Sequence, residues 1–202
     1  MNPTKNIYPV FDQILTREDK ERLLRQNSKT IWFTGLSGSG KTTLAKELEK
    51  RLNYNGYLTQ ILDGDNIRSG INNNLGFSEE DRMENIRRIS EVTKLLIHSG
   101  VITLNSFISP TREIRHRAME IIGKENFIEI FVSTPLEVCE QRDTKGLYKK
   151  AREGKIKNFT GIDSPFEAPE DADIDIDTSK FSTEECVEQI LKIVLPKITY
   201  WS

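Results

Sequence analysis

One short glycine-rich segment constrains this chain more than any other feature of its sequence. Residues 35–42 read GLSGSGKT, which matches the pattern G-x-x-x-x-G-K-[ST] at every fixed position. The apolar run Thr30–Thr34 precedes the segment and predicts a buried strand, and the helical pattern Thr42–Tyr54 follows it. A strand, a phosphate-binding loop and a helix in this order are typical of the first unit of an α/β domain with a parallel sheet.

The residue types in this segment suit the binding of a nucleoside triphosphate. Glycines at 35, 38 and 40 let backbone N–H groups converge on phosphate oxygens, and the start of the helix adds a favourable dipole. Lys41 supplies a cation for the β- and γ-phosphates, and the hydroxyl of Thr42 suits Mg²⁺. A glycine-rich turn without a ligand is the alternative, but the strand and helix around the motif favour a site. The predicted ATP-binding residues are Gly35, Leu36, Ser37, Gly38, Ser39, Gly40, Lys41 and Thr42.

Strand-like and helix-like patterns alternate along the rest of the chain. The alternation predicts a three-layer α/β fold of the phosphate-loop kinase type: a parallel five-stranded sheet with helices on both faces. The further expected strands are Tyr57–Leu62, Val101–Ile108, Phe127–Val132 and Asp173–Ile176. The expected helices are Thr16–Asn27, Ser78–Ser99, Thr111–Ile122, one that begins with Thr134 as N-cap, and Ser182–Leu195.

The chain is expected to form one domain. Residues 1–29 are expected to form an N-terminal extension with a short helix that belongs to the same domain, and residues 30–202 the domain that carries the phosphate loop. Residues 143–172 lack periodicity and are dense in Lys, Gly and Pro, which predicts a lid-like loop region over the site.

Composition excludes several classes of protein. The 202 residues carry 29 Lys and Arg against 31 Asp and Glu, a formal net charge of −2, which argues against nucleic acid or a membrane surface as partner. No apolar run exceeds three residues, far short of the ~20 of a membrane span. Two cysteines, Cys139 and Cys186, make no disulfide framework. A cytoplasmic protein is the expectation.

A second group of polar residues follows the second expected strand. Asp63 and Asp65 come at its carboxyl end, where ligands bind in such sheets; one carboxylate could hold Mg²⁺ and the other could take a proton from an attacking hydroxyl. An ordinary Asp-Gly turn is the alternative. Arg82 and Asn85 share one helix face and could bind an anion, while Phe77 could stack on a ring or serve as a hydrophobic staple.

The absence of two sequence features narrows the class of phosphate-loop protein. No N-K-x-D tetrapeptide marks a guanine site, and the third expected strand ends without the acidic pair common in motor ATPases. His98 and His116 have no partners at metal-ligand spacing, and Cys139 fits a core position better than a nucleophile. A small-molecule kinase therefore fits best.

Taken together, the motifs resemble the adenylyl-sulfate kinase family. The resemblance extends over about three-quarters of the chain, from residue 30 to residue 178, and several motifs occur in the same order. The matching segments are 35–42, DGDNIR at 63–68, LGFSEEDR at 75–82 with ENIRR at 84–88, SFISP at 106–110, TPLEVC at 134–139, GLYKKAR at 146–152 and NFTGID at 158–163.

The resemblance implies a transferase that uses ATP and Mg²⁺ to phosphorylate the 3′-hydroxyl of adenylyl sulfate in sulfate assimilation, giving 3′-phosphoadenylyl sulfate and ADP. It implies a homodimer and catalytic roles for Lys41, Asp63, Asp65 and Ser109, with Thr42 and Asp63 at the metal. The residues it places at the acceptor are Asp65, Arg68, Phe77, Arg82, Asn85, Ile108, Ser109, Lys145, Leu147 and Phe159. Ser69 and Thr111 depart from the family's usual residues at positions beside the acceptor.

Ser109 raises a separate question about the route of transfer. The resemblance makes it a phosphoserine intermediate, hence a phosphoprotein. No general base lies near it in the sequence, however, and an acceptor hydroxyl can attack the γ-phosphate directly. We expect that Ser109 can become phosphorylated when the acceptor is absent, and that direct transfer dominates when both substrates are bound.

Two alternative functions remain open from the residues alone. The chain could be another small kinase, acting on a nucleoside monophosphate, gluconate or shikimate. It could also be a binding module that senses ATP without transferring a phosphoryl group. Turnover with different acceptors, or ATP binding without acceptor-dependent ADP release, would distinguish these alternatives.

Overall fold

The computed structural model describes residues 7–10 and 13–200 and contains one parallel sheet in the order β2-β3-β1-β4-β5. β1, which leads into the phosphate loop, lies at the centre and pairs in parallel with both β3 and β4. The predicted five-stranded parallel sheet is confirmed. Its strands are β1 (Thr30–Thr34), β2 (Thr59–Asp63), β3 (Ile102–Ser106), β4 (Phe127–Val132) and β5 (Ile174–Ile176).

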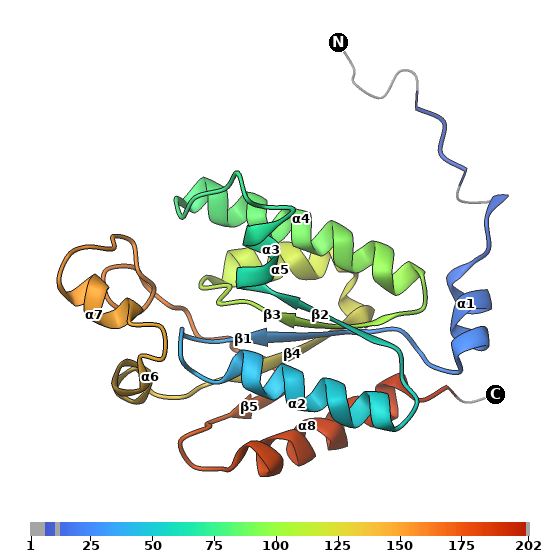
Figure 1. The fold of residues 1–202 in the computed structure, drawn as a ribbon. Coiled ribbons are helices and arrows are strands. Elements are labelled where there is room, and N and C mark those ends of the chain that lie inside the picture. Colours follow the sequence, from blue (N-terminus) through green and yellow to red (C-terminus); the bar gives the residue numbers. More distant parts are fainter. Residues whose placement is uncertain (1–6, 11–12, 201–202) are drawn as a thin grey trace.

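Helices cover both faces of the sheet, as expected. Figure 1 shows α4 and α5 on one face and α2 and α8 on the other, while α6 and α7 project beyond the carboxyl ends of the strands. The helices are α1 (Arg17–Leu24), α2 (Lys41–Tyr54), α3 (Gly64–Ser69), α4 (Glu79–His98), α5 (Arg112–Ile122), α6 (Leu136–Arg142), α7 (Leu147–Arg152) and α8 (Thr183–Ile198), with a 3₁₀ turn, η2, at Lys124–Asn126.

Alternating side chains of β1 separate two apolar cores, because successive residues of a strand point to opposite faces. Ile31 and Phe33 are buried with side chains of α2 and α8, such as Leu44 and Ile190. Trp32 points the other way, is fully buried, and lies among side chains of α4 and α5. The central strand therefore holds the phosphate loop on a base that is packed on both faces.

Several predicted helix starts are confirmed in detail. The Thr16 and Ser182 side chains form capping boxes with Asp19 and Glu185, and Ser78 accepts a hydrogen bond from the backbone of Asp81. The N-cap predicted at Thr134 is wrong by one residue, since α6 begins after Pro135. The Thr134 hydroxyl instead donates to the Ser39 carbonyl, so it supports the phosphate loop and not the helix.

The structure also departs from the expected element lengths. β3 ends at Ser106 and not at Ile108, and Ser109 beyond it takes a left-handed backbone with φ 40°. α8 continues past Leu195 and through Pro196 to the buried Ile198. The short helices α3 and α7 were not predicted.

Candidate active site

The phosphate loop has a backbone that only glycine adopts easily. Gly35, Gly38 and Gly40 all have positive φ, at 146°, 75° and 106°. A Cβ on Gly35 would lie 2.5 Å from the carbonyl oxygen of Val132, so the adjoining strand also excludes a side chain there. The loop leads directly into α2, whose N-cap is Gly40. The predicted cradle of backbone N–H groups at a helix start is therefore present as a local structure.

Lys41 lies at the base of this loop. Its Nζ donates to the carbonyl oxygens of Gly35, at 2.9 Å, and Leu36, at 2.6 Å, and the side chain is buried. Burial lowers the pKa of the Lys41 ammonium from 10.5 to about 8, because the charged form loses solvation. A phosphate group in the loop would supply the negative charge that this ammonium lacks in the free protein.

Hydroxyl and carboxylate oxygens meet beside the loop. Thr42 Oγ1 donates to Asp63 Oδ2 at 2.8 Å and lies 3.2 Å from Ser106 Oγ. Oxygen donors of this kind are what Mg²⁺ prefers, and Mg²⁺ is commonly held by one or two protein groups together with phosphates and water. Among residues 7–10 and 13–200 no group of three His, Cys, Asp or Glu forms a protein-only metal cage. The donor set fits a Mg²⁺ ion that arrives with a nucleotide.

Three of the residues expected at the acceptor lie together across from the loop. The Arg68 guanidinium lies 4.4 Å from the centre of the Phe77 ring and donates to the carbonyl of Gly76 at 2.8 Å. Arg82 Nε donates to the carbonyl of Phe77 at 3.0 Å. The Phe77 side chain is 63% exposed, although its backbone is held on both sides. A flat apolar ring beside two guanidinium groups suits a ligand that combines a base with an anion.

Asn85 has a different position from its helix neighbour Arg82. It is buried, and its amide oxygen accepts a hydrogen bond from Asn72 Nδ2 at 2.9 Å. Asn72 is itself fully buried in the segment between α3 and α4. In the free protein Asn85 therefore anchors the segment that carries Phe77.

Residues of the segment predicted as a lid contact both groups of residues. Lys145 forms an ion pair with Asp65 on α3, and the Tyr148 hydroxyl donates to the carbonyl of Ser37 in the phosphate loop at 2.9 Å. Phe159 packs edge-on against the Tyr148 ring with centroids 5.0 Å apart. Tyr148 lies in the GLYKKAR segment that resembles the family, but no role was predicted for it.

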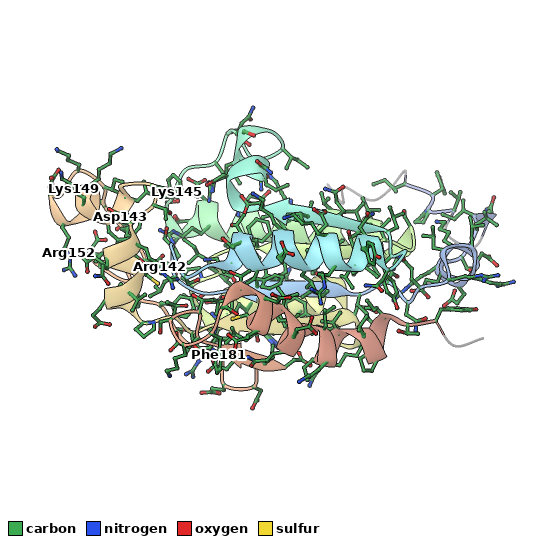
Figure 2. The ribbon with its side chains drawn as sticks, turned by 60° about the horizontal axis from the view of Figure 1, so that its bottom comes forward. Arg142, Asp143, Lys145, Lys149, Arg152 and Phe181 are labelled. Atoms are coloured by element: carbon green, nitrogen blue, oxygen red, sulfur yellow. The ribbon has the colours of Figure 1, made fainter. Side chains whose placement is uncertain are left out.

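Residues 158–160 of the lid segment form hydrogen bonds with Arg82 on the acceptor side. Arg82 Nη1 donates to Thr160 Oγ1 at 2.9 Å and Nη2 to the carbonyl of Asn158. Leu147 is the first residue of α7, whose free N–H groups bind the Asp143 carboxylate. Figure 2 labels four basic side chains and one acidic side chain around α6 and α7: Arg142, Lys145, Lys149 and Arg152, with Asp143. Lys145 is paired with Asp65 and Arg152 with Glu140.

The surroundings of Ser109 were not predicted from the sequence. It is 3% exposed, and its Oγ accepts a hydrogen bond from Trp32 Nε1 at 3.1 Å and donates one to Thr34 Oγ1 at 2.9 Å. The neighbouring carbonyl of Ile108 accepts from Thr34 Oγ1 at 2.8 Å. These partners come from β1, and neither of them is a base that could take the serine proton.

Thr178 also supports the phosphate loop, although no sequence motif predicts this role. Thr178, just after β5, donates from Oγ1 to the carbonyl of Ser39 at 2.8 Å, and its methyl group would lie 3.2 Å from a Cβ on Gly40. Arg142 Nη1 donates to Thr178 Oγ1 at 2.8 Å. Loops after β4 and β5 therefore brace the phosphate loop from the side opposite the acceptor residues.

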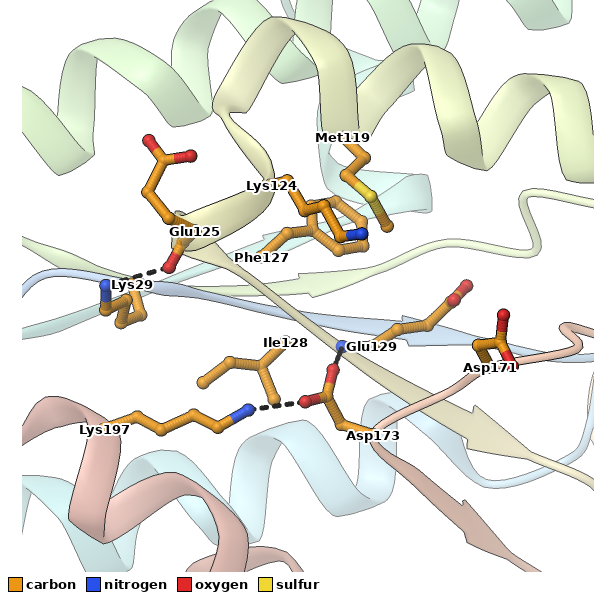
Figure 3. Close-up of a pocket in the computed structure, with 10 residues that line it drawn as sticks. All are labelled: Lys29, Met119, Lys124, Glu125, Phe127, Ile128, Glu129, Asp171, Asp173 and Lys197. Atoms are coloured by element: carbon orange, nitrogen blue, oxygen red, sulfur yellow. Dashed lines mark hydrogen bonds and ion pairs between the residues drawn. The ribbon is translucent and has the colours of Figure 1, made fainter.

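A cavity among the described residues lies elsewhere in the structure. It has a volume of about 690 Å³ and lies at the start of β4, the opposite edge of the sheet from the phosphate loop (Figure 3). Two of its lysines are already engaged, Lys197 with Asp173 and Lys29 with the carbonyl of Glu125. We therefore assign the functional site to the carboxyl edge, where the phosphate loop and the lid meet, and not to this cavity.

Comparison with known proteins identifies the family. The family model described as adenylylsulphate kinase matches residues 27–177, which is more than half of the chain. The chain belongs to the adenylylsulphate kinase family. A relative named adenylyl-sulfate kinase, from Bacteroides thetaiotaomicron, is 64% identical over 98% of both chains.

Solved structures of the family have the same fold. The Mycobacterium tuberculosis APS kinase in complex with AMPPNP and APS is 44% identical, with a TM-score of 0.81 over 84% of this chain and 98% of that one. A hexameric APS kinase from Thiobacillus denitrificans is 31% identical, with a TM-score of 0.64 over 88% of this chain and 30% of that one. Within the described residues, no helix is both long and apolar enough to cross a membrane.

Proposed function

We propose that the chain transfers the γ-phosphoryl group of ATP to the 3′-hydroxyl of adenylyl sulfate, giving 3′-phosphoadenylyl sulfate and ADP. The observation that carries the proposal is the 64% identity, over 98% of the chain, to a protein named adenylyl-sulfate kinase. The arrangement of the site supports it. Lid contacts join the phosphate loop, through Ser37, to the acceptor side, through Asp65 and Arg82.

The donor half of the site would bind ATP through residues 35–42. Lys41 would exchange its two carbonyl partners for phosphate oxygens, which keeps its ammonium charged as negative charge develops. Thr42 and Asp63 would hold Mg²⁺, directly or through water, and a bound Mg²⁺ ion would neutralise charge on the phosphates.

The acceptor half would align the 3′-hydroxyl for a direct attack. The Arg68, Phe77 and Arg82 group offers a ring and two cations to the base and anionic part of adenylyl sulfate. The acceptor oxygen would bond to the γ-phosphorus while the bond to the bridging oxygen breaks, and ADP would leave with that electron pair. Asp65 is the carboxylate placed to accept the hydroxyl proton once Lys145 moves off it.

Direct transfer is the route that the surroundings of Ser109 support. Its hydroxyl already donates to Thr34, accepts from Trp32 and is buried, so it lacks both a base and an open approach. Phosphorylation of Ser109 would be a slow side reaction in the absence of acceptor. We further expect a homodimer and a cytoplasmic location, where ATP is supplied.

A coupled ADP-release assay across a panel of acceptors tests the proposal. Adenylyl sulfate, AMP, gluconate and shikimate are offered in turn with ATP and Mg²⁺, and mass spectrometry identifies the product. We expect turnover with adenylyl sulfate and a product with one added phosphate on the ribose. Turnover only with another acceptor would indicate a different kinase, and ATP binding without acceptor-dependent ADP release would indicate a binding module. Lys41→Ala provides the inactive control.

A further inference from the structure

A buried arginine connects the loop after β3 to the return of the lid. Arg115 on α5 is 3% exposed. Its Nη1 donates to the carbonyl of Ser109 at 2.8 Å, and its Nη2 donates to the carbonyl of Glu167 at 2.7 Å. Its Nε lies 3.1 Å from Glu129 Oε1 in an ion pair that is also buried. One guanidinium group therefore binds three separate segments of the chain.

The contact between Arg115 and the Ser109 carbonyl supports an unfavourable backbone conformation. Ser109 has a left-handed backbone with φ 40°, which is unfavourable for a residue other than glycine and needs support from its surroundings. Apart from Arg115, the Ser109 carbonyl has a hydrogen bond only from Thr34 Oγ1 among the described residues, at the longer distance of 3.3 Å. Arg115 thus makes the stronger of the two contacts that hold this backbone.

The return of the lid is fastened to the same loop by further bonds. The backbone N–H of Glu167 donates to the carbonyl of Pro110 at 2.8 Å, and the backbone N–H of Arg112 donates to Glu167 Oε2 at 2.8 Å. The Arg115 guanidinium also lies 5.8 Å from the centre of the Phe166 ring. Residues 109–112 and 166–168 therefore form one joined unit with Arg115 beneath it.

We infer that Arg115 is a positioning residue for the acceptor: it holds the Ser109 loop in its functional conformation and makes the return of the lid move with that loop. The inference rests on the proposed function in one respect, the location of the acceptor beside Ile108 and Ser109. Arg115 itself touches no substrate in this account. Its effect reaches the acceptor through the backbone of Ser109 and through Glu167.

Three variants separate the carbonyl contacts from the ion pair. Arg115→Met removes both. Arg115→Lys keeps a cation for Glu129 but cannot reach both carbonyls at once, because an ammonium lacks the fork of a guanidinium. Glu129→Gln weakens the ion pair and leaves both carbonyl contacts in place. Arg117→Met is the matched control, since Arg117 is on the same helix, is half exposed and, among the described residues, bonds only to Glu120.

Steady-state kinetics with ATP and adenylyl sulfate give the first measurement. Loss of hydrogen bonds from a charged donor predicts a KM for the acceptor that rises about tenfold or more in Arg115→Met, with a KM for ATP that changes by less than about twofold. Arg115→Lys should fall between this variant and wild type. Glu129→Gln should lower the melting temperature but change the acceptor KM by less than about threefold, and Arg117→Met should change neither.

Hydrogen exchange of the free enzyme gives the second measurement, which needs no activity. The amides of Glu167 and Arg112 should exchange faster together in Arg115→Met and stay protected in Glu129→Gln. A lower melting temperature with unchanged acceptor KM and unchanged exchange would overturn the inference, as would equal rises in both KM values. An effect of Glu129→Gln as large as that of Arg115→Met would also overturn it. If wild type does not use adenylyl sulfate, the proposed function fails and the exchange result alone decides the inference.

Discussion

Replacing Arg82 by alanine should weaken acceptor binding and leave ATP binding nearly intact. Arg82 holds the carbonyl of Phe77 on one side, and Thr160 and the carbonyl of Asn158 in the lid on the other. The side chain makes no hydrogen bond to residues 35–42. The substitution therefore acts on the acceptor side of the site and on the closing of the lid over it.

The expected size follows from the number of bonds that are lost. A hydrogen bond to a charged group contributes about 1.5–3 kcal/mol, and water replaces part of that at the half-buried Arg82. A net loss equal to one such bond weakens acceptor binding by about 10- to 100-fold. The free energy of ATP binding should change by less than about 0.5 kcal/mol, as for a substitution remote from the ligand.

Isothermal titration calorimetry measures both affinities on the same samples, with AMPPNP for the donor and adenylyl sulfate for the acceptor. Arg87→Ala is the control, because Arg87 is on the same helix, is exposed, and bonds only to Glu84. The acceptor affinity of the wild type should also fall with salt, because the attraction is local and electrostatic. Equal losses of affinity for both ligands in Arg82→Ala would refute the reasoning.

Three further predictions concern the donor loop and Ser109. Lys41→Ala should keep the fold, because among the described residues its amine bonds only to loop carbonyls, and its kcat should fall by about 10²–10³. Circular dichroism checks the fold and the ADP-release assay checks the rate. A rate above about a tenth of the wild-type rate would contradict the prediction. Burial lowers the pKa of Lys41 to about 8, so the free enzyme loses this charge as pH rises through 8, while bound phosphates retain it. ATP affinity measured by calorimetry should therefore fall about fivefold between pH 8 and pH 9, and a flat profile would exclude this linkage. Ser109→Ala should retain a substantial part of its rate with a higher acceptor KM; a phosphoserine that forms and decays at the turnover rate in rapid-quench experiments, with an inactive alanine variant, would support the covalent route instead.

The parts of the fold that were predicted to the residue have strong local patterns. β1 and β4 are short apolar runs between turn residues, and their predicted bounds match the structure. The helices α3 and α7 have six residues each, too few for a periodic pattern, and α7 depends on the single carboxylate of Asp143 at its start. Segments of this kind exist only because the surrounding structure holds them.

The residues of the candidate site also differ in how well the sequence predicts their surroundings. The phosphate loop is contiguous, so its chemistry can be read from the order of its residues. The surroundings of Ser109 depend on the pairing of β1 with β3, which brings Trp32 and Thr34 to it from 77 and 75 residues away. Arg115 lies in none of the recognised segments, and the GLYKKAR segment does not reveal the partner of Tyr148; in both cases the partners lie in other parts of the chain. Such contacts follow from topology and register, which no local pattern encodes.

The contact between the segment before β1 and the end of α8 indicates where this enzyme can be attached to something else. Asn27 donates from its backbone to the carbonyl of Ile198 at 2.7 Å and from its side chain to that of Thr199 at 2.8 Å, which fixes the exit of α8 against the segment before β1. The chain therefore enters β1 and leaves α8 at the amino edge of the sheet, and Figure 1 shows α1 and the end of α8 on the opposite side from α6 and α7. A surface anchor, a fluorescent label or a whole second protein attached to α1 or to the end of α8 would leave the substrate entrance clear and the lid free to close.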